Sequence, residues 1–514
     1  MNDLPKNQNE QELEETSTVF SNPQEHEHKV TKNQNKKRLK IIISSVLAVA
    51  VLLGGTFAVI KLIPEKEDPT APKIEEITVL DIKTDDIKEV TVENKNGTFK
   101  LTSKQIKEDD ETTTVWLLDG YDAELTDSYS IENIVSNMAS VSAIREITSK
   151  SSKDCGLEKP AVKAVIKTKD KNITLDVGSK SLDNSGVYVK VSTDNKIYLV
   201  ADTLDETLTF KALDMANTDA IPALDISEKY SEYYQEDSLA SFDSLTVTGV
   251  NFPQKLIIVQ NDEETSKFLP YTVTSPMKRS AENVDSIFEV FKTGITVTGA
   301  YSFDTSVKTL TNLGFKSPDF AITAKFGDYE YTYKFKKQSD GDYAVIGTDS
   351  KMVKKIALSD YAFLEYKASN FYSSVVFLES IDTVSNLTIK DGNKTCSFDI
   401  KANPDKEDED NKYIINYNGK KIASSQFQSF YQLFLSLSST DFTIDNINQK
   451  PEVSITVKYN DKKPTNTIEF VKVNAINYQY SIDGMEMGKV SSSQVKKLLR
   501  SVEKLISGEE IVVN

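Results

Sequence analysis

The sequence predicts an α+β fold built from three tandem repeats, each a helix packed on an antiparallel β-sheet, after one N-terminal transmembrane helix. Three observations predict this class: an uncharged apolar stretch near the N-terminus, one order of elements that recurs three times, and alternating polarity within every unit. At roughly 150 residues per domain, a chain of 514 residues has room for about three domains.

The composition excludes several classes of protein. Hydrophobic residues make up 39% and charged residues 27% of the chain, which is typical of folded domains and excludes wholesale disorder. The net charge of −17 argues against a general nucleic-acid binder, because such proteins need clustered basic side chains. With two cysteines and two histidines, the chain lacks the residues for a disulfide scaffold or a Cys/His zinc domain.

The strongest local signal is the uncharged stretch from Ile41 to Ile60, which as a helix would span the roughly 30 Å of a bilayer's hydrocarbon core. Four basic residues precede it, namely Lys36, Lys37, Arg38 and Lys40. The positive-inside rule therefore predicts a cytoplasmic N-terminus and an extracytoplasmic bulk. A cleaved signal peptide would have a shorter apolar core, so we predict an uncleaved signal-anchor helix over residues 39–63 of a single-pass cell-membrane protein, with the lipid bilayer as a partner.

The segments around this anchor are polar. Residues 1–38 are rich in Asn, Gln, Glu and Lys, which predicts a disordered cytoplasmic tail. Both histidines, His26 and His28, lie in this tail; a metal site at that spacing is a weaker interpretation than a solvated leader. Residues 64–74 are interpreted as a linker to the first repeat.

The three repeats are placed at residues 75–228, 238–368 and 378–514. Each contains short strands, an amphipathic helix, a further strand, a proline, a run of β-hairpins and a closing helical segment. In each amphipathic helix, apolar side chains recur at a spacing of three and four residues and so share one face. These side chains are Ile131, Ile134, Val135, Met138 and Val141; Val284, Ile287, Phe288, Phe291 and Ile295; and Phe427, Phe430, Tyr431, Phe434 and Leu437.

A proline marks the start of the hairpins in every unit, at Pro160, Pro318 and Pro451. Proline is tolerated at the first residue of a strand, because its missing N–H costs nothing there. Gly156 and Gly314 precede the first two prolines, where the chain needs to turn with positive φ, and the third unit has an asparagine in that place. Successive prolines are roughly 130 to 160 residues apart, which fits tandem domains better than a solenoid.

The segments after each proline are typical of half-exposed antiparallel strands. In the first unit they read NITLDVG, GVYVKV and KIYLV, with tyrosines and valines at a period of two. The units are then predicted to close with the helical segments DTLDETLTF, LSDYAFLEY and SSQVKKLLRSVEKL.

The first unit also resembles a known family. Its motifs, in order, are Trp116-Leu-Leu, a helix, an Arg145-Glu strand, Gly156-Leu157-Glu-Lys-Pro160, Leu175-Asp-Val-Gly178 and Gly186-Val-Tyr188. This order resembles the bacterial family described as domain of unknown function 4340, over residues 75–215. The resemblance implies a membrane-anchored, extracytoplasmic protein with an accessory role beside transporters of the ABC class, whose permease subunits would be partners. It implies no particular chemistry.

Motifs for catalysis are missing from the sequence. The segment after the anchor contains no histidine, which excludes Ser-His-Asp and Cys-His nucleophiles and His-ligated metals there. No phosphate-binding loop, dinucleotide fingerprint or nucleophile elbow occurs. We therefore predict a non-enzymatic protein with no catalytic residue, no metal site and no cofactor.

Four other features have simple interpretations. Trp116 lies in a strand-like run and is assigned to core packing. Cys155 and Cys396 fall in different units and are interpreted as buried thiols. The acidic run from Asp405 to Asp410 lacks EF-hand spacing, so a solvated hairpin tip is favoured over a Ca²⁺ site. Carboxylates are plentiful, so a hydrolase with two of them about 5–10 Å apart in a cleft stays a minor hypothesis.

The sequence thus predicts a membrane-anchored extracytoplasmic protein that works as an accessory or interaction module of an ABC-type transport complex. The alternative is a freestanding cell-surface module that binds a wall or extracellular ligand, which a deep groove lined with aromatic side chains would favour. Nucleic acid is excluded as a partner, and the oligomeric state is not predicted.

Overall fold

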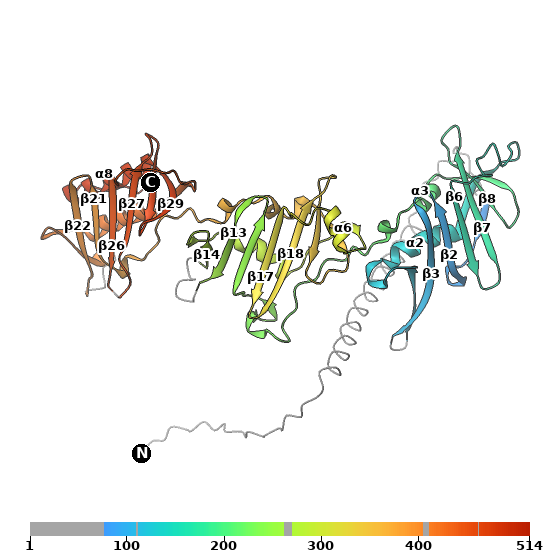
Figure 1. Cartoon of the computed structure of the whole chain (residues 1–514), viewed down its shortest axis with the longest axis horizontal. Coiled ribbons are helices and arrows are strands. Elements are labelled where there is room, and N and C mark those ends of the chain that lie inside the picture. The colour runs from blue at the N-terminus through green and yellow to red at the C-terminus, as the bar shows by residue number, and fades with distance from the viewer. Residues whose placement is uncertain (1–76, 109–110, 262–269, 405–410, 461, 514) are drawn as a thin grey trace, which may run out of the picture. The chain divides into compact units, whose positions relative to one another are not determined.

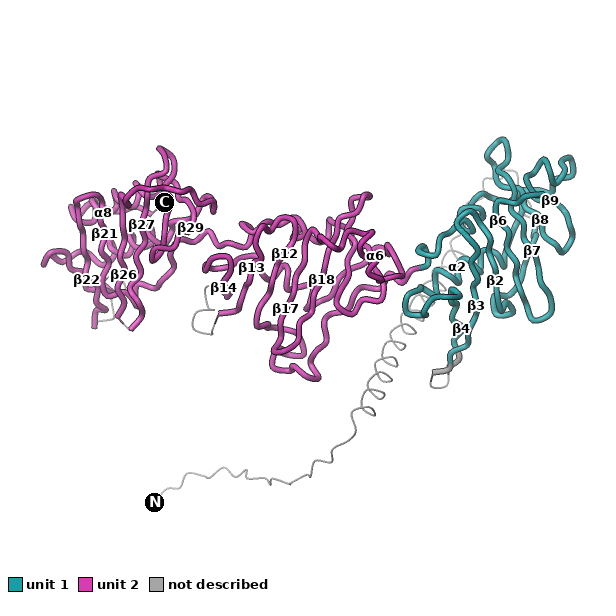
Figure 2. The backbone as a smooth tube through the Cα atoms, in the orientation of Figure 1, with its two compact units in different colours: residues 1–215 teal, residues 216–514 magenta. Residues whose placement is uncertain are grey.

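A computed structural model describes residues 77–108, 111–261, 270–404, 411–460 and 462–513 of the chain. The chain divides into two compact units, residues 1–215 and 216–514 (Figure 2). The tail, the anchor and the linker predicted for residues 1–38, 39–63 and 64–74 lie outside the described residues, as does the acidic run. The repeat boundaries remain predictions.

Unit 1 contains one antiparallel sheet of nine strands, in the order β1-β5-β9-β8-β7-β6-β2-β3-β4 (Figure 1). Its elements are β1 (Ile77–Asp81), β2 (Ile87–Asn94), β3 (Gly97–Glu108), β4 (Glu111–Leu118), α2 (Ser128–Ala139), β5 (Ser140–Glu146), β6 (Val162–Thr168), β7 (Asn172–Lys180), β8 (Val187–Val191), β9 (Ile197–Val200) and α3 (Thr203–Leu208).

The core of unit 1 lies between α2 and one face of the sheet. The Asp127 side chain begins α2 by accepting hydrogen bonds from the backbone N–H groups of Tyr129 and Ser130. Ile131, Val135 and Met138 are fully buried on the inner side of α2, among strand residues that include Trp116 at 1% exposure. Each such side chain stabilises the fold by roughly 1.5–3 kcal/mol relative to exposure.

Unit 2 begins with a second nine-stranded antiparallel sheet, in the order β15-β14-β13-β12-β17-β18-β19-β20-β16, and a small β10-β11 pair. Its elements are β10 (Tyr234–Gln235), β11 (Ser238–Leu239), β12 (Ser244–Gly249), β13 (Phe252–Gln260), β14 (Tyr271–Ser275), β15 (Arg279–Ser280), α5 (Val284–Lys292), β16 (Gly299–Ser302), α6 (Val307–Asn312), β17 (Phe320–Phe326), β18 (Tyr329–Lys337), β19 (Tyr343–Gly347) and β20 (Val353–Ile356). Its core is rich in aromatic side chains, including Phe288, Phe291 and Tyr333.

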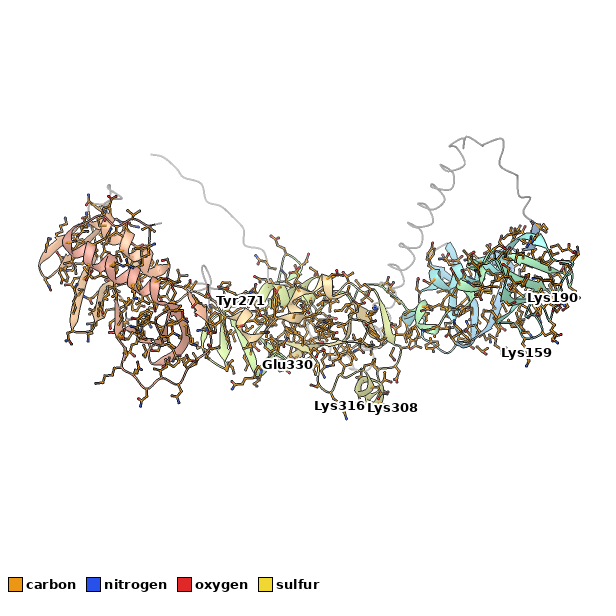
Figure 3. All side chains as sticks on the ribbon, turned by 90° about the horizontal axis from the view of Figure 1, so that it is seen from above. Lys159, Lys190, Tyr271, Lys308, Lys316 and Glu330 are labelled. Atoms are coloured by element: carbon orange, nitrogen blue, oxygen red, sulfur yellow. The ribbon has the colours of Figure 1, made fainter. Side chains whose placement is uncertain are left out.

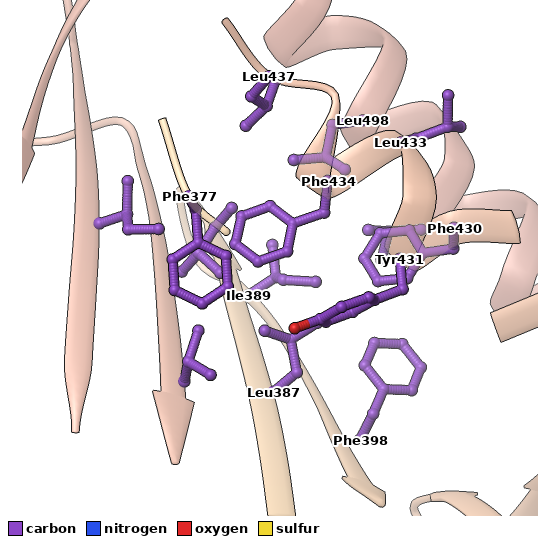
Figure 4. Close-up of a cluster of buried hydrophobic side chains, with 14 of the residues drawn as sticks. Phe377, Leu387, Ile389, Phe398, Phe430, Tyr431, Leu433, Phe434, Leu437 and Leu498 are labelled. Atoms are coloured by element: carbon purple, nitrogen blue, oxygen red, sulfur yellow. The ribbon is translucent and has the colours of Figure 1, made fainter. Parts of the chain in front are cut away.

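A third nine-stranded sheet completes unit 2, in the order β24-β23-β22-β21-β26-β27-β28-β29-β25. Its elements are β21 (Val384–Asp391), β22 (Lys394–Ala402), β23 (Tyr413–Tyr417), β24 (Lys420–Ile422), α7 (Ser424–Leu435), β25 (Ser439–Asp441), β26 (Val453–Tyr459), β27 (Asn466–Lys472), β28 (Asn477–Ile482), β29 (Met485–Ser491) and α8 (Ser492–Ser507). Figure 4 shows Phe434 of α7 beside Phe377, with a ring-centroid distance of 4.8 Å.

The three sheets share one order over eight strands. In each, the strand that follows the proline (β6, β17 or β26) pairs with the first strand of the meander (β2, β12 or β21). Pro160, Pro318 and Pro451 lie two residues before β6, β17 and β26, where their missing N–H removes no ladder hydrogen bond. The ninth strand differs: it is β1 at one edge of the first sheet, and β15 or β24 at the opposite edge of the other two.

The predicted α+β class, with repeats made of one helix on a sheet, is wrong. Strands make up 43% and helices 21% of the structure, so the protein is mainly β. The described residues form six α-helices, two of which, α3 and α6, are only six residues long. Strands are about twice as abundant as helices, because antiparallel strands can be joined by short hairpins and each added hairpin widens the sheet without a helical crossover.

The helix boundaries also differ from the sequence pattern. Val141 continues the helical spacing but lies in β5, while Ile295 and Leu437 lie beyond the ends of α5 and α7. The closing segment LSDYAFLEY forms short 3-10 turns rather than an α-helix. Within the described part of the chain, no helix has the length and apolar character to cross a membrane.

Candidate functional site

The second face of each of the first two sheets carries a small apolar cluster, separate from the main core. In unit 1 it consists of Cys155, Leu157, Tyr188, Ile197 and Leu199. Successive residues of a strand point to opposite faces, so Tyr188 lies in this cluster while its neighbours Val187 and Val189 lie in the main core.

Four of the sequence landmarks meet at the unit 1 cluster. Gly156 turns the chain with φ of +71°, as its place before the proline predicts. The carbonyl oxygen of Cys155 accepts a hydrogen bond of 3.0 Å from the backbone N–H of Ser179, and it lies so close to Gly178 that a Cβ there would be 2.1 Å away. Leu157 and Tyr188 complete the contact. Trp116 is in the main core instead, and Pro160 is half-buried before β6.

The unit 1 cluster is closed by its own side chains. The Lys150 ammonium donates to the Tyr188 hydroxyl and lies 4.7 Å from the centre of its ring, and this hydrogen bond raises the pKa of Lys150. Burial raises the pKa of the Cys155 thiol, which keeps the sulfur protonated and unreactive. Cys155 and Cys396 are both free and buried.

The corresponding cluster on the second sheet supports an open groove. Here the covering segment is helix α6, and Phe315, Ala344 and Val353 are buried beneath it. Ser306 begins the helix by accepting a hydrogen bond of 3.3 Å from the N–H of Thr309. Gly314, with φ of +86°, ends the helical segment, and the Gln338 side chain donates to the carbonyl of Leu313 at 3.1 Å.

We refer to this space as the α6 groove. Its cavity volume is about 450 Å³, within the range of ligand sites, and it is open to solvent. Its lining comprises Val307, Leu310, Thr311, Phe315, Lys316, Thr332, Lys334, Ile346, Gly347 and Thr348. Figure 3 labels Lys316 of the lining and Lys308 of α6.

The apolar side of the α6 groove is unusually exposed. Val307 is 80% exposed, whereas Phe315 is 6% exposed and forms the buried base. Leu310 and Ile346 also line the groove and are half-buried. Removing an exposed valine side chain from water is favourable, so the groove favours an apolar occupant.

The rim of the α6 groove is basic. Lys316 and Lys334 belong to the lining and are exposed, and Lys308 lies on α6 beside them. None of these three lysines forms an ion pair with another residue that the structure describes. The lining itself contains no acidic side chain. In a chain of net charge −17, this is a local positive surface next to an apolar one.

Hydroxyl groups occupy the floor along β18. Thr332 and Thr323 share a hydrogen bond of 2.8 Å between their hydroxyls, and the Thr348 hydroxyl accepts from the N–H of Thr332 at 2.9 Å. Gly347 pairs with Tyr333, and a Cβ at Gly347 would lie 2.5 Å from the Tyr331 hydroxyl oxygen. The floor is therefore fixed by short contacts, while its hydroxyl oxygens keep further lone pairs for a ligand.

A charged cluster fastens the strand that precedes α6. The Tyr301 hydroxyl of β16 donates to Asp340 at 2.7 Å, and the Lys355 ammonium donates to Asp340 at 2.8 Å and to Asp342 at 2.9 Å. The bonds from Lys355 and Tyr301 lower the pKa of Asp340 to about 2, and burial together with Asp340 raises the pKa of Tyr301.

This cluster predicts an acid-sensitive site. Because the pKa of Asp340 is lower in the folded chain than its ordinary value of 3.8, its stabilising effect is present above pH 4 and is lost as the pH falls toward 2. We expect amide hydrogen exchange of residues 299–316, corrected for intrinsic rates, to become less protected over that range. Asp340→Asn should remove the pH dependence; an equal acid response in that variant would contradict the assignment.

A second cavity, also of about 450 Å³, lies beside α5. Its lining includes two carboxylates, Glu289 and Asp360, both exposed. Glu289 contacts Lys292 at 3.3 Å, and Asp360 accepts from the Ser359 hydroxyl at 3.0 Å. A glycosidase-type general acid needs a sheltered carboxyl group, so this cavity offers no support for the hydrolase hypothesis. Within the described ranges, no group of three or more His, Cys, Asp or Glu side chains could hold a metal ion.

The sequence landmarks did not identify the α6 groove. Gly314 and Pro318 lie near it but do not line it, and neither Val307 nor the two lining lysines stood out by spacing. The one sequence signal was the alternation of Glu330, Thr332 and Lys334 on the exposed face of β18, which marks a polar surface and no particular ligand.

Comparison with known proteins places one segment of the chain in a family. Residues 116–228 match the family described as Domain of unknown function (DUF4340), which confirms the resemblance read from the motifs of the first unit. The matched segment includes the unit 1 cluster but not the α6 groove. No curated protein and no solved structure is significantly similar to the chain.

Proposed function

We propose that this chain is a non-enzymatic interaction module, tethered to the outer side of the cell membrane by residues 39–63, and an accessory to an ABC-type transport complex. The observation that carries the interaction role is the α6 groove, an open site with an apolar wall and a basic rim. The tether and the transporter link are supported by the uncharged stretch from Ile41 to Ile60 and by the family resemblance.

The chemistry of the α6 groove supports binding rather than catalysis. Its lining offers two lysines, three threonines and apolar side chains, with no carboxylate, thiol or imidazole beside them. A nucleophile needs a base within hydrogen-bond reach, and neither the lysines nor the threonines have one in the lining. What remains is recognition through apolar contact, hydroxyl hydrogen bonds and positive charge.

A membrane tether would strengthen such a module. Holding the groove near a membrane complex converts the encounter into an intramolecular one, which raises the effective concentration at the partner. A weak groove is then sufficient for stable association, in agreement with an open site of modest volume.

The experiment that tests this function is cross-linking in native membranes, followed by gentle extraction and identification of the proteins that co-purify with the full chain. A chain lacking residues 61–514 is the control. We expect permease or ATPase subunits of a transporter with the full chain and their loss with the control. Recovery of wall polymer instead would support the freestanding cell-surface binder, and recovery of nothing would refute the accessory role.

A further inference from the structure

We propose that the α6 groove binds a peptide segment of a partner protein in which acidic side chains alternate with aliphatic or aromatic ones. This inference rests on the interaction role proposed above and names the chemistry of the partner. Three properties of the groove support this inference: its exposed apolar wall, its lysines, which have no ion-pair partner in the described part of the chain, and its threonines.

The apolar wall of the groove favours a partner that supplies an apolar side chain. Val307 of α6 is 80% exposed and lines the same cavity as the half-buried Leu310 and the buried Phe315. An isolated exposed valine is ordinary, but one that continues into a buried cluster along an open cavity forms a binding surface. A single aliphatic or aromatic side chain of a partner would extend this cluster outward.

The lysines of the groove favour a partner that also carries negative charge. Lys316 and Lys334 line the groove from α6's C-terminal side and from β18, and Lys308 adds a third ammonium on the helix. Two other lysines of this sheet form ion pairs: Lys336 with Asp319 at 3.0 Å, and Lys355 with Asp340 at 2.8 Å. Among the described residues, the lysines of the groove have no ion-pair partner, and complementary charge on a ligand would give specificity and a faster encounter.

The polar floor favours a peptide over a lipid. Thr311, Thr332 and Thr348 place hydroxyl groups along the groove, which suit the N–H and C=O groups of an extended backbone. A lipid chain would need an enclosed apolar tunnel, whereas this cavity is open and its floor is lined with hydroxyls. We therefore assign a peptide segment as the occupant and treat an anionic membrane as an outcome of the test.

The test is selection of peptides from a random dodecapeptide phage library on the full chain in detergent, followed by binding measurements with fluorescent copies of the enriched peptides. We expect enriched sequences to combine Asp or Glu with Leu, Ile or Phe. Their affinity should fall at least tenfold, about 1.4 kcal/mol, for the double variant Lys316→Glu with Lys334→Glu. Val307→Asp should weaken binding as well, and because Val307 is exposed this variant should fold normally.

The matched control carries the same change in charge on the same sheet. Lys255 of β13 and Lys325 of β17 are exposed and lie outside the groove, so Lys255→Glu with Lys325→Glu should leave affinity within twofold. Enriched peptides without acidic residues, no enrichment, or equal loss in both double variants would overturn the proposal.

A second measurement separates peptide from membrane. Vesicles of equal parts phosphatidylcholine and phosphatidylglycerol should bind the double groove variant and the double control variant equally. If vesicle binding depends on Lys316 and Lys334 while peptide binding does not, the occupant is an anionic lipid surface and the peptide assignment is wrong. If transporter subunits co-purify with the groove variant as with the native chain, the proposed function stands and this inference fails.

Discussion

Gly178→Ala is expected to lower the free energy of unfolding of unit 1 by about 3 kcal/mol, the upper part of the range for an overpacked site. A Cβ at residue 178 would lie 2.1 Å from the carbonyl oxygen of Cys155 and 3.1 Å from Leu157. Backbone cannot yield as a flexible side chain does, so the segment around Cys155 would have to leave β7. That movement would break the hydrogen bond of 3.0 Å between the Ser179 N–H and the Cys155 carbonyl, and expose Leu157.

The chain contains its own reporter for this experiment. Its single tryptophan, Trp116, is 1% exposed in the core of unit 1, so tryptophan fluorescence during urea unfolding follows unit 1 alone. Gly299→Ala is the matched control, because a Cβ at residue 299 meets nothing closer than 3.8 Å and the residue lies in unit 2. An unchanged urea midpoint for Gly178→Ala would contradict the close approach of the two backbones.

Arg279→Ala is expected to destabilise unit 2 by about 2–4 kcal/mol, because it leaves a void between two aromatic rings. The guanidinium of Arg279 is 6% exposed, with its Cζ 4.9 Å from the centre of the Tyr372 ring and 4.6 Å from that of Phe442. Its Nη2 donates to the carbonyl of Met487 in β29. One side chain thus joins β15 of the second sheet to strands of the third.

The charge of Arg279 contributes less to the stability of unit 2 than the packing of its side chain does. Burial lowers the pKa of Arg279, and neither its Nε nor its Nη1 has a hydrogen-bond partner within the described part of the chain. A buried charge without a full set of partners is costly, so an apolar side chain of similar length should replace it with a loss of only about 1 kcal/mol. Arg279→Met is the variant that tests this.

The measurement for both Arg279 variants is hydrogen exchange followed by mass spectrometry on the full chain, read at β15, at residues 372–376 and at β29. Ala281, next to β15, forms a bridge with Tyr372. Val375 forms a bridge with Ser438, next to β25, and β25 pairs with β29. We expect faster exchange at all three in the alanine variant and little change in the methionine variant. Equally accelerated exchange in both variants would mean that the charge of Arg279, and not its packing, joins the two sheets.

Much of the strand content was predictable because local pattern and local chemistry agree. Alternation of buried and exposed residues in segments such as YEYTYKF is realised in β18, where Tyr331, Tyr333 and Phe335 are buried. The turn at Asp483 and Gly484 has φ of +51° and +80°, the positive pair that a two-residue hairpin needs. These features depend on neighbours within a few residues and are therefore visible in the sequence.

The fold class was mispredicted because helical periodicity overstates the share of helix. The pattern that begins in α2 runs on through Val141, but that residue belongs to β5 and is buried from the strand. A residue that fits the helical spacing fits one face of a following strand equally well, and long-range pairing of β5 with β9 and β1 decides between them. Nothing local to Val141 contains that information.

The groove was missed for a related reason. Helix α6 has six residues, and its valine and threonines are weak helix formers, so no periodic signal marks it. It forms because Ser306 caps it and because Leu310 packs on the cluster around Phe315. Lys316 and Lys334 are far apart in the sequence and face one cavity only once α6 lies across β18.

By itself, the sequence determined the resemblance of residues 116–228 to a family of unknown function. It also determined the prolines that precede the central strands and the alternation in the strands that follow them, because short-range backbone constraints specify both. The tertiary structure alone decided that the protein is mainly β, that Gly178 is needed for a backbone contact with Cys155, and that an apolar wall and a basic rim share one groove. These depend on contacts between residues distant along the chain, and such contacts are fixed only when the sheets assemble.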